Sequence, residues 1–399
     1  MTNKILFFFL FILVFELKAQ DKDTIYIYKN NDTVKQVDGI DYLIKLFKIK
    51  NSQEKIENKK VHFSYFPTDS ENAGGRVLVS SFNATFFLGD KKDTKNSTIY
   101  LIPYISFNNQ FGLEMYPTIW LNKNSWNFVG EYFVLNFPQE TWGLGGDSPE
   151  SNETYIDGKQ IRFHQNVLKS IIPNLAIGIG YQYDKHYELE IEEEESNSTN
   201  PDLPENIKST TISSGISFPL IYDNRKNINN PQQGMYVGIT YLYNDTSLGS
   251  DTKWQSIFMD FRKYFAIPNS RSVLGFRSYY WSILSGEVPY FDLPSTRSEP
   301  GTGSASRGLQ KNRYRSKDMV FFESEYRFNI SRNGLWGGVV FANTTAASEI
   351  ESRNFEHWQP AIGTGVRLKF SKYTKVNLAF DIGFSKDYTN VYLKIGEVF

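Results

Sequence analysis

The sequence contains no cysteine, so a disulfide framework and a lipid attached at cysteine are both excluded. Long apolar runs are also scarce. After the first 20 residues there is no stretch of about 18 apolar residues, which excludes a transmembrane helix in the rest of the chain. The net charge is only −1, which argues against nucleic acid as a partner. An exported protein of this kind needs a source of stability other than disulfides.

The chain begins MTNKILFFFLFILVFELKAQ, where Lys4 precedes an unbroken apolar run over residues 5–15. Ala19 is a small residue suited to a cleavage site. This order of a basic residue, a short apolar run and a small residue predicts a signal peptide over 1–20. The apolar run is too short to cross a bilayer as a helix, so we expect export rather than anchoring.

Aromatic residues are abundant, with 25 Tyr, 32 Phe and 7 Trp making 16% of the chain, while the mean hydropathy is −0.42. A transmembrane β-barrel has this composition, because its lipid face is apolar, its lumen is polar and the two average out.

Several segments alternate between apolar and polar or small residues, as strands do when their two faces meet different surroundings. In 319–328 the polar face carries Glu323, Glu325 and Arg327, and 361–370 and 376–385 alternate in the same way. The alternation lasts about ten residues, which is longer than most soluble strands and suits a tilted membrane strand. A soluble β-sandwich, the alternative, would have shorter strands.

This pattern predicts an all-β fold, a transmembrane antiparallel β-barrel of 16 strands, because bacterial barrels have an even number. The predicted strands are 62–67, 76–88, 98–108, 111–122, 125–142, 159–171, 174–190, 209–222, 234–243, 252–266, 271–284, 318–330, 336–347, 359–370, 375–385 and 390–399. The barrel domain is therefore expected over 61–399.

Turn lengths suggest the orientation, because periplasmic turns are short and extracellular loops are long. Residues 268–271 and 385–390 form short turns, whereas 184–208 and 285–317 are long. The acidic run Glu192–Glu195 reads as part of a solvated loop and not as a metal site.

Residues 21–60 form a short periplasmic segment ahead of the barrel. Ile40, Leu43, Ile44 and Phe47 have helical spacing and predict one amphipathic helix, begun by Asp38 or Asp41. We expect this helix to dock at the periplasmic mouth. The segment is too small to hold a series of periplasmic domains.

The stretch SRGLQKNRYRSKDMVFFESEYRF (306–328) places Arg307, Arg313 and Arg315 just before the strand that carries the lumen charges. Charges inside a barrel must be paired unless the lumen is simply wet. The sequence therefore predicts that the 285–317 loop folds inward and sets an arginine fork on a strand carboxylate, with Gly308 allowing a tight turn. A porin with an ordinary outer loop is equally compatible with the charges alone.

The same stretch resembles the loop-six motif and following strand of the BamA/TamA-type outer-membrane assembly factors, the bacterial surface antigen family. It is most similar to a sub-branch common in Bacteroidetes that lacks POTRA domains. Three more stretches resemble family motifs, in order along the chain. They are the periplasmic turn 221–234 with Asp223, Arg225, Pro231 and Gly234, the FxDxG position at 339–348, and the C-terminal signal 391–399 with Ile395, Gly396 and Phe399.

The resemblance implies that Arg307 pairs with Glu325 and with the aspartate of FxDxG. In this chain the position of that aspartate is Asn343 and the position of the glycine after it is Thr345. The contact between the loop arginine and the strands therefore lacks one ionic partner. Arg313, Arg315, Glu323 and Arg327 are expected to be accessory charges. Phe399 is expected in the aromatic belt at the membrane interface.

The resemblance further implies a barrel in the cell outer membrane that assists the insertion or passage of polypeptides through a labile seam between its first and last strands. Membrane lipid, unfolded client proteins and a separate periplasmic or surface partner are the expected partners. A passive pore or structural barrel is the alternative. We expect no enzyme activity, cofactor or metal, because His62, His164, His186 and His357 are scattered in the sequence.

Overall fold

The structure is a computed structural model of the 399-residue chain. It describes residues 25–27, 33–39, 41–42, 45, 61–72, 75–90, 93–105, 111–136, 138–191, 209–268, 270–301, 305–371 and 375–399. The predicted signal peptide and the acidic run Glu192–Glu195 lie outside these residues.

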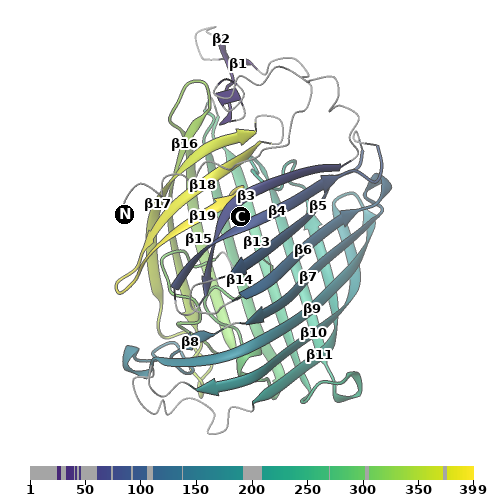
Figure 1. The fold of residues 1–399 in the computed structure, drawn as a ribbon, viewed down its shortest axis with the longest axis vertical. Coiled ribbons are helices and arrows are strands. Elements are labelled where there is room, and N and C mark those ends of the chain that lie inside the picture. Colours follow the sequence, from purple (N-terminus) through teal and green to yellow (C-terminus); the bar gives the residue numbers. More distant parts are fainter. Residues whose placement is uncertain are drawn as a thin grey trace.

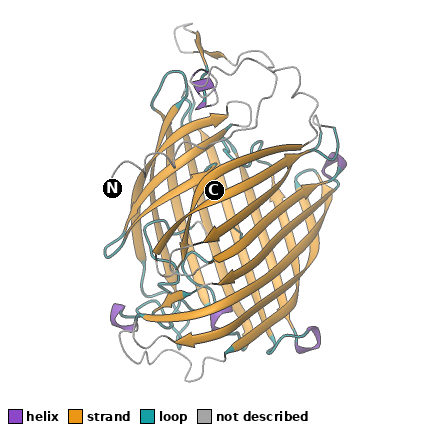
Figure 2. Ribbon diagram, viewed as in Figure 1, coloured by secondary structure: helices purple, strands orange, loops and turns teal. Residues whose placement is uncertain are grey.

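Sixteen long strands form one antiparallel sheet, which confirms the predicted strand number (Figures 1 and 2). They are β3 (Val61–Asn72), β4 (Gly75–Phe86), β5 (Ser97–Ile105), β6 (Phe111–Trp120), β7 (Trp126–Asn136), β9 (Thr154–Ile172), β10 (Leu175–Ile191), β11 (Thr210–Asp223), β12 (Gly234–Asn244), β13 (Trp254–Ala266), β14 (Val273–Gly286), β15 (Asp318–Asn329), β16 (Trp336–Ala347), β17 (Gln359–Ser371), β18 (Val376–Phe384) and β19 (Thr389–Ile395).

Three short strands complete the described strands. β1 (Ile25–Ile27) and β2 (Thr33–Lys35) pair with each other outside the barrel. β8 (Gln139–Thr141) pairs with the first residues of β9. The single strand predicted at 125–142 is therefore two strands, β7 and β8. Both pair with β9, which is long enough to take them one after the other.

The sheet curls into a barrel in which β19 is followed by β3 (Figure 1). We call the end that holds the C-terminus the terminal end and the opposite end, with residues 287–317, the loop end. Because successive strands are antiparallel, the connection 385–388 lies at the loop end. The prediction that grouped 385–390 with the short turns of the periplasmic side was therefore wrong, since a turn directly before the last strand lies opposite the C-terminus.

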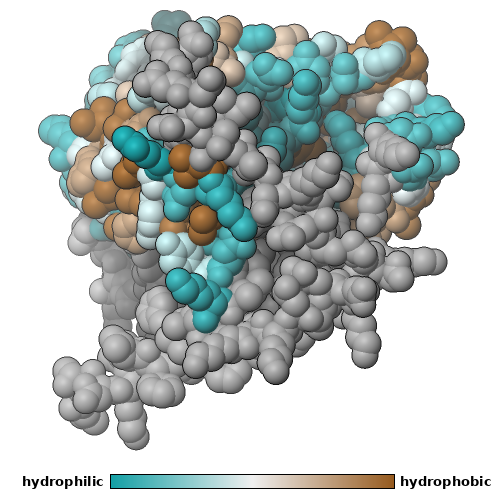
Figure 3. Space-filling model, turned by 90° about the horizontal axis from the view of Figure 1, so that it is seen from above, coloured by the Kyte–Doolittle hydropathy of each residue, from teal (hydrophilic) through white to brown (hydrophobic). Residues whose placement is uncertain are grey.

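The two faces of β15 differ as the alternation predicted. Glu323, Glu325 and Arg327 are buried toward the lumen, while Phe322 and Tyr326 are exposed on the outside. Other strands repeat this pattern, and hydrophobic residues are visible on the outer side of the wall in the view from the terminal end (Figure 3). An outer face of this kind suits contact with lipid.

The segment ahead of the barrel contacts the terminal end. The amide of Val37 donates to the carbonyl of Asn333 at 3.2 Å. Asp38 and Asp41 each accept a hydrogen bond from the other's amide, at 2.9 and 3.1 Å, the reciprocal pattern of a helix start. The apolar positions of the predicted helix, Ile40, Leu43, Ile44 and Phe47, lie outside the described residues.

In the part of the chain that the structure describes, helices long and apolar enough to cross a bilayer are absent.

The last strand ends at Ile395 and not at Phe399 as predicted. Gly396 has φ +86°, a left-handed conformation that favours glycine, and the chain turns there into the barrel. We call residues 396–399 the C-terminal tail. Phe399 is 3% exposed and packs against Tyr264 and Val273 on the lumen side. Its expected place in the outer aromatic belt is therefore corrected.

The buried position of Phe399 predicts a loss of stability on truncation. Phe399→Ala should lower the free energy of unfolding by about 3–5 kcal/mol, because a cavity replaces a buried ring. Phe265→Ala, which removes a ring that is 48% exposed, is the matched control and should cost less. The measurement is the urea midpoint of the heat-modifiable gel shift in reconstituted protein. Equal losses in both variants would show that the tail is not packed inside.

Candidate functional site in the barrel lumen

The connection between β14 and β15, residues 287–317, enters the barrel and brings its backbone against β17 and β18. Gly308 has φ +96°, and a Cβ at this position would lie 2.9 Å from both the Ala361 Cβ and the Phe384 amide nitrogen. Gly383 on β18 faces it equally closely, since a Cβ there would lie 2.7 Å from the Gly308 nitrogen. Glycine is therefore required on both sides of this contact.

The neighbouring Arg307 is 1% exposed and binds three carboxylates. Its Nη2 donates to Glu323 and to Glu325 on β15, and its Nη1 donates to Asp381 on β18 at 2.5 Å. The guanidinium also lies 3.6 Å from the centre of the Phe341 ring. The alternative of an ordinary solvated outer loop does not fit this geometry, because the arginine is inside and desolvated.

Three further hydrogen bonds hold the backbone around Arg307. Asn343 Nδ2 donates to the Arg307 carbonyl at 2.9 Å, and the Gly308 amide donates to the Tyr392 hydroxyl at 2.8 Å. The hydroxyls of Ser306 and Thr345 are 2.7 Å apart. Loop, β16 and β19 are thus joined at one point.

The carboxylates of Arg307 belong to a larger arrangement. Arg327 Nε donates to Glu325 at 2.5 Å and lies 3.6 Å from Glu397. Arg367 Nε donates to Glu397 at 2.7 Å, and its Nη1 donates to Asp381. Positive and negative side chains therefore alternate around a circle, which we call the charge ring, of Arg307, Glu325, Arg327, Glu397, Arg367 and Asp381.

All six members of the charge ring are at most 8% exposed. A buried ion is costly unless it is paired and hydrogen-bonded, and each member of this ring lies between two partners of opposite sign. Glu323, which is outside the ring, is the third carboxylate that pairs with Arg307. The ring joins the inward loop, β15, β17, β18 and the C-terminal tail.

The structure brings Arg307 and Glu325 together, the pair that the family resemblance implied, but it differs in the remaining partners. Glu323, expected to be accessory, binds the arginine directly. Asn343 binds the arginine backbone instead of its guanidinium. The carboxylate missing at Asn343 is supplied by Asp381, two strands further along the sheet. The lumen face of β18 carried that signal, because Asp381 is an acidic residue among small and amide side chains.

Arg313 and Arg315 do not reach the strand carboxylates that the sequence suggested. Arg313 donates to Ser148, with Nη2 at 2.9 Å from its carbonyl, and so fixes the loop to the connection between β8 and β9. Arg315 Nη1 donates to the Tyr290 carbonyl at 3.0 Å, within the same loop. Both arginines order the loop near the loop end.

A second anchor of the loop lies at the 3₁₀ turn η5 (Tyr290–Asp292). The Ser213 hydroxyl donates to Asp292 at 2.5 Å, and the Tyr290 and Thr141 hydroxyls are 2.6 Å apart. Burial, together with the charge of Asp184, raises the pKa of Asp292 to about 7 from 3.8. The stability that this raised pKa contributes is complete below pH 3.8 and is lost as the pH rises through about 7.

The predicted periplasmic turn lies at the terminal end between β11 and β12. Arg225 Nε donates to Asp223 at 2.8 Å, and Gly234 begins β12 with φ +108°. Pro231 offers its carbonyl to Arg327 Nη1 at 3.3 Å. One member of this turn therefore contacts the charge ring.

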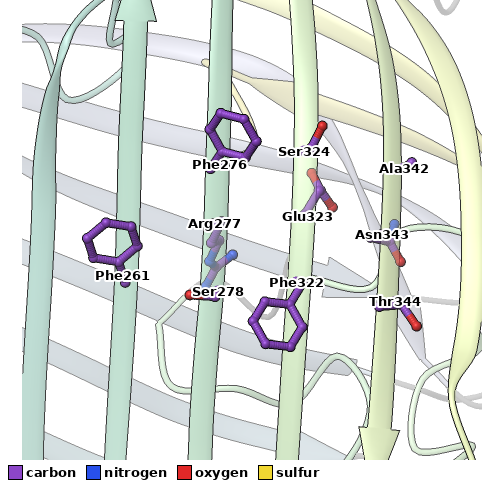
Figure 4. A pocket seen from close by; sticks show the side chains of 10 residues that line it. All are labelled: Phe261, Phe276, Arg277, Ser278, Phe322, Glu323, Ser324, Ala342, Asn343 and Thr344. Atoms are coloured by element: carbon purple, nitrogen blue, oxygen red, sulfur yellow. The ribbon is translucent and has the colours of Figure 1, made fainter.

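The outer wall behind the ring is hollowed. A depression of about 530 Å³ lies over β13 to β16, where small residues such as Ser278, Ser324 and Ala342 separate the rings of Phe276 and Phe322 (Figure 4). Arg277, Glu323 and Asn343 belong to the same stretch of wall and are buried. Small residues thus separate the bulky aromatic ones on the outer face of the wall that carries Glu323.

Removing one partner of the Arg307 contact should be costly. Arg307→Ala should lower the free energy of unfolding by about 3–5 kcal/mol, since several buried carboxylates lose their cation. Glu325→Ala should also destabilise, and the double variant should lose less than the sum. The measurements are the urea midpoint and protease access to the loop. Arg313→Ala is the matched control and should have the smaller effect. Strict additivity would show that Arg307 and Glu325 act separately.

Asn343→Asp should destabilise the barrel by about 1–3 kcal/mol, because a carboxylate cannot donate to the Arg307 carbonyl and a buried acceptor is left without its donor. Glu323 lies directly opposite residue 343 on the neighbouring strand, so the new charge also meets a like charge. Asn343→Ala, measured by the same urea midpoint, separates the two causes and should cost less. A more stable Asn343→Asp variant would mean that the carboxylate reaches the guanidinium.

No protein-family model and no curated protein matches the chain. Solved structures do resemble it. BamA from Haemophilus ducreyi lacking POTRA domains 1-3 has TM-score 0.54 and 13% identity, covering 95% of this chain and 75% of that one. CdiB from Acinetobacter baumannii has TM-score 0.54 and 12% identity, covering 84% and 60%. CdiB from Escherichia coli has TM-score 0.54 and 9% identity, covering 94% and 67%. At these identities the likeness concerns the fold alone, which is that of BamA- and CdiB-type outer-membrane β-barrels.

Proposed function

We propose that this protein is an outer-membrane barrel that assists the insertion or passage of polypeptides through the seam between β3 and β19. The process is non-covalent. An opened seam presents unpaired strand edges, and such an edge pairs readily with an incoming strand.

The seam is the observation that carries the proposal. β3 has 12 residues, whereas β19 has 7 and then turns inward at Gly396, so β19 cannot pair with the whole of β3. Among neighbouring long strands, these two also contact each other least. A short pairing is cheaper to open than the extended ladders elsewhere in the sheet.

A passive pore is the alternative function. The inward loop favours the seam over the pore, because Arg307, Gly308 and Leu309 are buried inside the barrel where a wide channel would need space. A structural role without transport would leave the short seam unexplained.

The contacts of the histidines do not match those of a hydrolase active site. His164 Nε2 lies 2.5 Å from Asp184, and His186 Nδ1 lies 3.8 Å from Asp292. A nucleophilic serine, however, must donate its proton to a histidine, and the Ser213 hydroxyl donates to the Asp292 carboxylate instead. Both groups are better explained as anchors of the wall and the loop.

We further propose that clients arrive through a separate partner at the terminal end, where the described part of the segment ahead of β3 lies. That segment contacts the terminal end through Val37 and Asn333. The terminal end then faces the periplasm, and the outer wall contacts membrane lipid.

Cross-linking the seam tests the proposed function, and the cysteine-free chain makes every introduced thiol unique. Val391→Cys in β19 is combined with single cysteines along β3. Reconstituted protein should speed the folding of a small urea-denatured outer-membrane barrel into liposomes. Oxidation should abolish the effect, because the seam can no longer open, and dithiothreitol should restore it.

The matched control places cysteines at Val167 and Ile179, which are cross-strand partners in β9 and β10. Oxidation of this pair should leave the folding rate unchanged. A protein that gives steady large conductance in planar bilayers and never speeds folding is a passive pore, and the proposal is then wrong.

A further inference from the structure

The C-terminal tail is tied to the inward loop through two chains of ion pairs. One leads from Arg307 through Glu325 to Arg327, and the other leads from Arg307 through Asp381 to Arg367. Both end on Glu397 in the tail, where Arg367 Nε donates at 2.7 Å and Arg327 Nε lies at 3.6 Å. Loop and tail therefore share a network although they lie 90 residues apart in sequence.

The tail has further contacts outside these two chains of ion pairs. Asn377 Nδ2 donates to Glu397 at 2.7 Å, and Phe399 packs against Tyr264 and Val273. Arg327 Nη2 donates to the Phe399 carbonyl at 2.9 Å, and its guanidinium lies 5.5 Å from the centre of the Phe399 ring. The Glu397 amide donates to the Asn229 carbonyl, and the Gly396 amide donates to the Asn377 carbonyl, both at 2.8 Å. The tail continues directly from β19, so whatever holds the tail inside also sets where β19 ends.

We propose that the charge ring couples the inward loop to the seam, with Arg327 and Arg367 as the positioning residues that hold the tail and thereby the end of β19. Release of Arg307 from its carboxylates leaves Glu325 and Asp381 to their other arginines. Those arginines then hold Glu397 less firmly, and the tail loosens. Withdrawal of the tail loosens the loop by the same amount, because coupling between two sites is reciprocal.

The expected loosening of the tail when the loop is released, and of the loop when the tail is released, follows from how the ring shares its charges. Each ring carboxylate is shared between two arginines, so the loss of one member changes the pairing of its neighbours as well as its own. A set of isolated pairs would confine the change to one partner. The role in opening the seam rests on the proposed function, whereas the coupling of loop and tail does not depend on it.

Thiol labelling of purified, reconstituted protein measures the coupling without any client. Leu309→Cys is the loop reporter and Val398→Cys is the tail reporter, each at a position that is 5% exposed. Leu168→Cys, at a position that is 1% exposed in β9, is the reporter of global opening. A buried thiol reacts with maleimide only when its surroundings open, so the rate measures local opening.

Glu397→Gln should speed labelling of the loop reporter by about 5-fold or more, and Asp381→Asn should speed labelling of the tail reporter by a similar factor. Arg327→Lys keeps the positive charge but should not keep the labelling slow at either reporter, since an ammonium cannot bridge two carboxylates as a guanidinium fork does. Labelling of the reporter at position 168 should stay unchanged. The amide substitutions keep the shape of the carboxylate, so these variants disturb packing less than Arg307→Ala does.

Asp245→Asn is the matched control, because it removes a buried carboxylate that binds Lys253 and Tyr243 and belongs neither to the charge ring nor to the inward loop. It should change neither loop nor tail labelling. The inference is overturned if Glu397→Gln speeds labelling only in the tail, or if all three reporters accelerate equally. The first result means that the tail is held locally, and the second means that the whole barrel opens. If oxidation of the seam cysteines leaves client folding unchanged while the loop and tail reporters still respond to each other's variants, only the proposed function is wrong.

Discussion

Burial of the Arg307 guanidinium is the constraint on which the rest of the lumen depends. A desolvated cation needs carboxylates within hydrogen-bonding distance, and they come from two strands of the barrel, Glu323 and Glu325 on β15 and Asp381 on β18. Those carboxylates need further cations, which Arg327 and Arg367 supply. The charge ring is the outcome of pairing both terminal nitrogens of one buried guanidinium with carboxylates.

The close backbone contact explains why the arginine reaches so far. Gly308 and Gly383 allow the loop to lie directly on β18, and Ala361 keeps the neighbouring strand small. A side chain at either glycine would push the loop away and separate Arg307 from Asp381. The close backbone contact and the ion pairs therefore both hold the loop against β18, and neither is sufficient for this without the other.

The same barrel combines a firmly bonded region with a weak one. Most neighbouring strands pair over nine or more residues, whereas β19 is short and ends where the chain turns inward. The charge ring lies beside that short strand and contacts its tail through Glu397. In the function we propose, the barrel stays folded while the seam opens, and the long ladders and the buried charges stabilise the rest of the sheet.

The sequence by itself determined the strand number and which side chains share a face of a strand, because period-two alternation fixes both faces. The pairing of Arg307 with Glu325 was implied only by the resemblance of the loop to a known family. The sequence also showed Arg367 and Asp381 on lumen faces without showing that they meet. Only the tertiary structure decided that Asp381 replaces the carboxylate absent at Asn343, that Phe399 is buried inside, and that Glu397 joins the ring. Those contacts depend on how strongly the sheet curves and on the turn of the chain into the lumen at Gly396. The alternation of residues in a single strand predicts neither the curvature nor the turn.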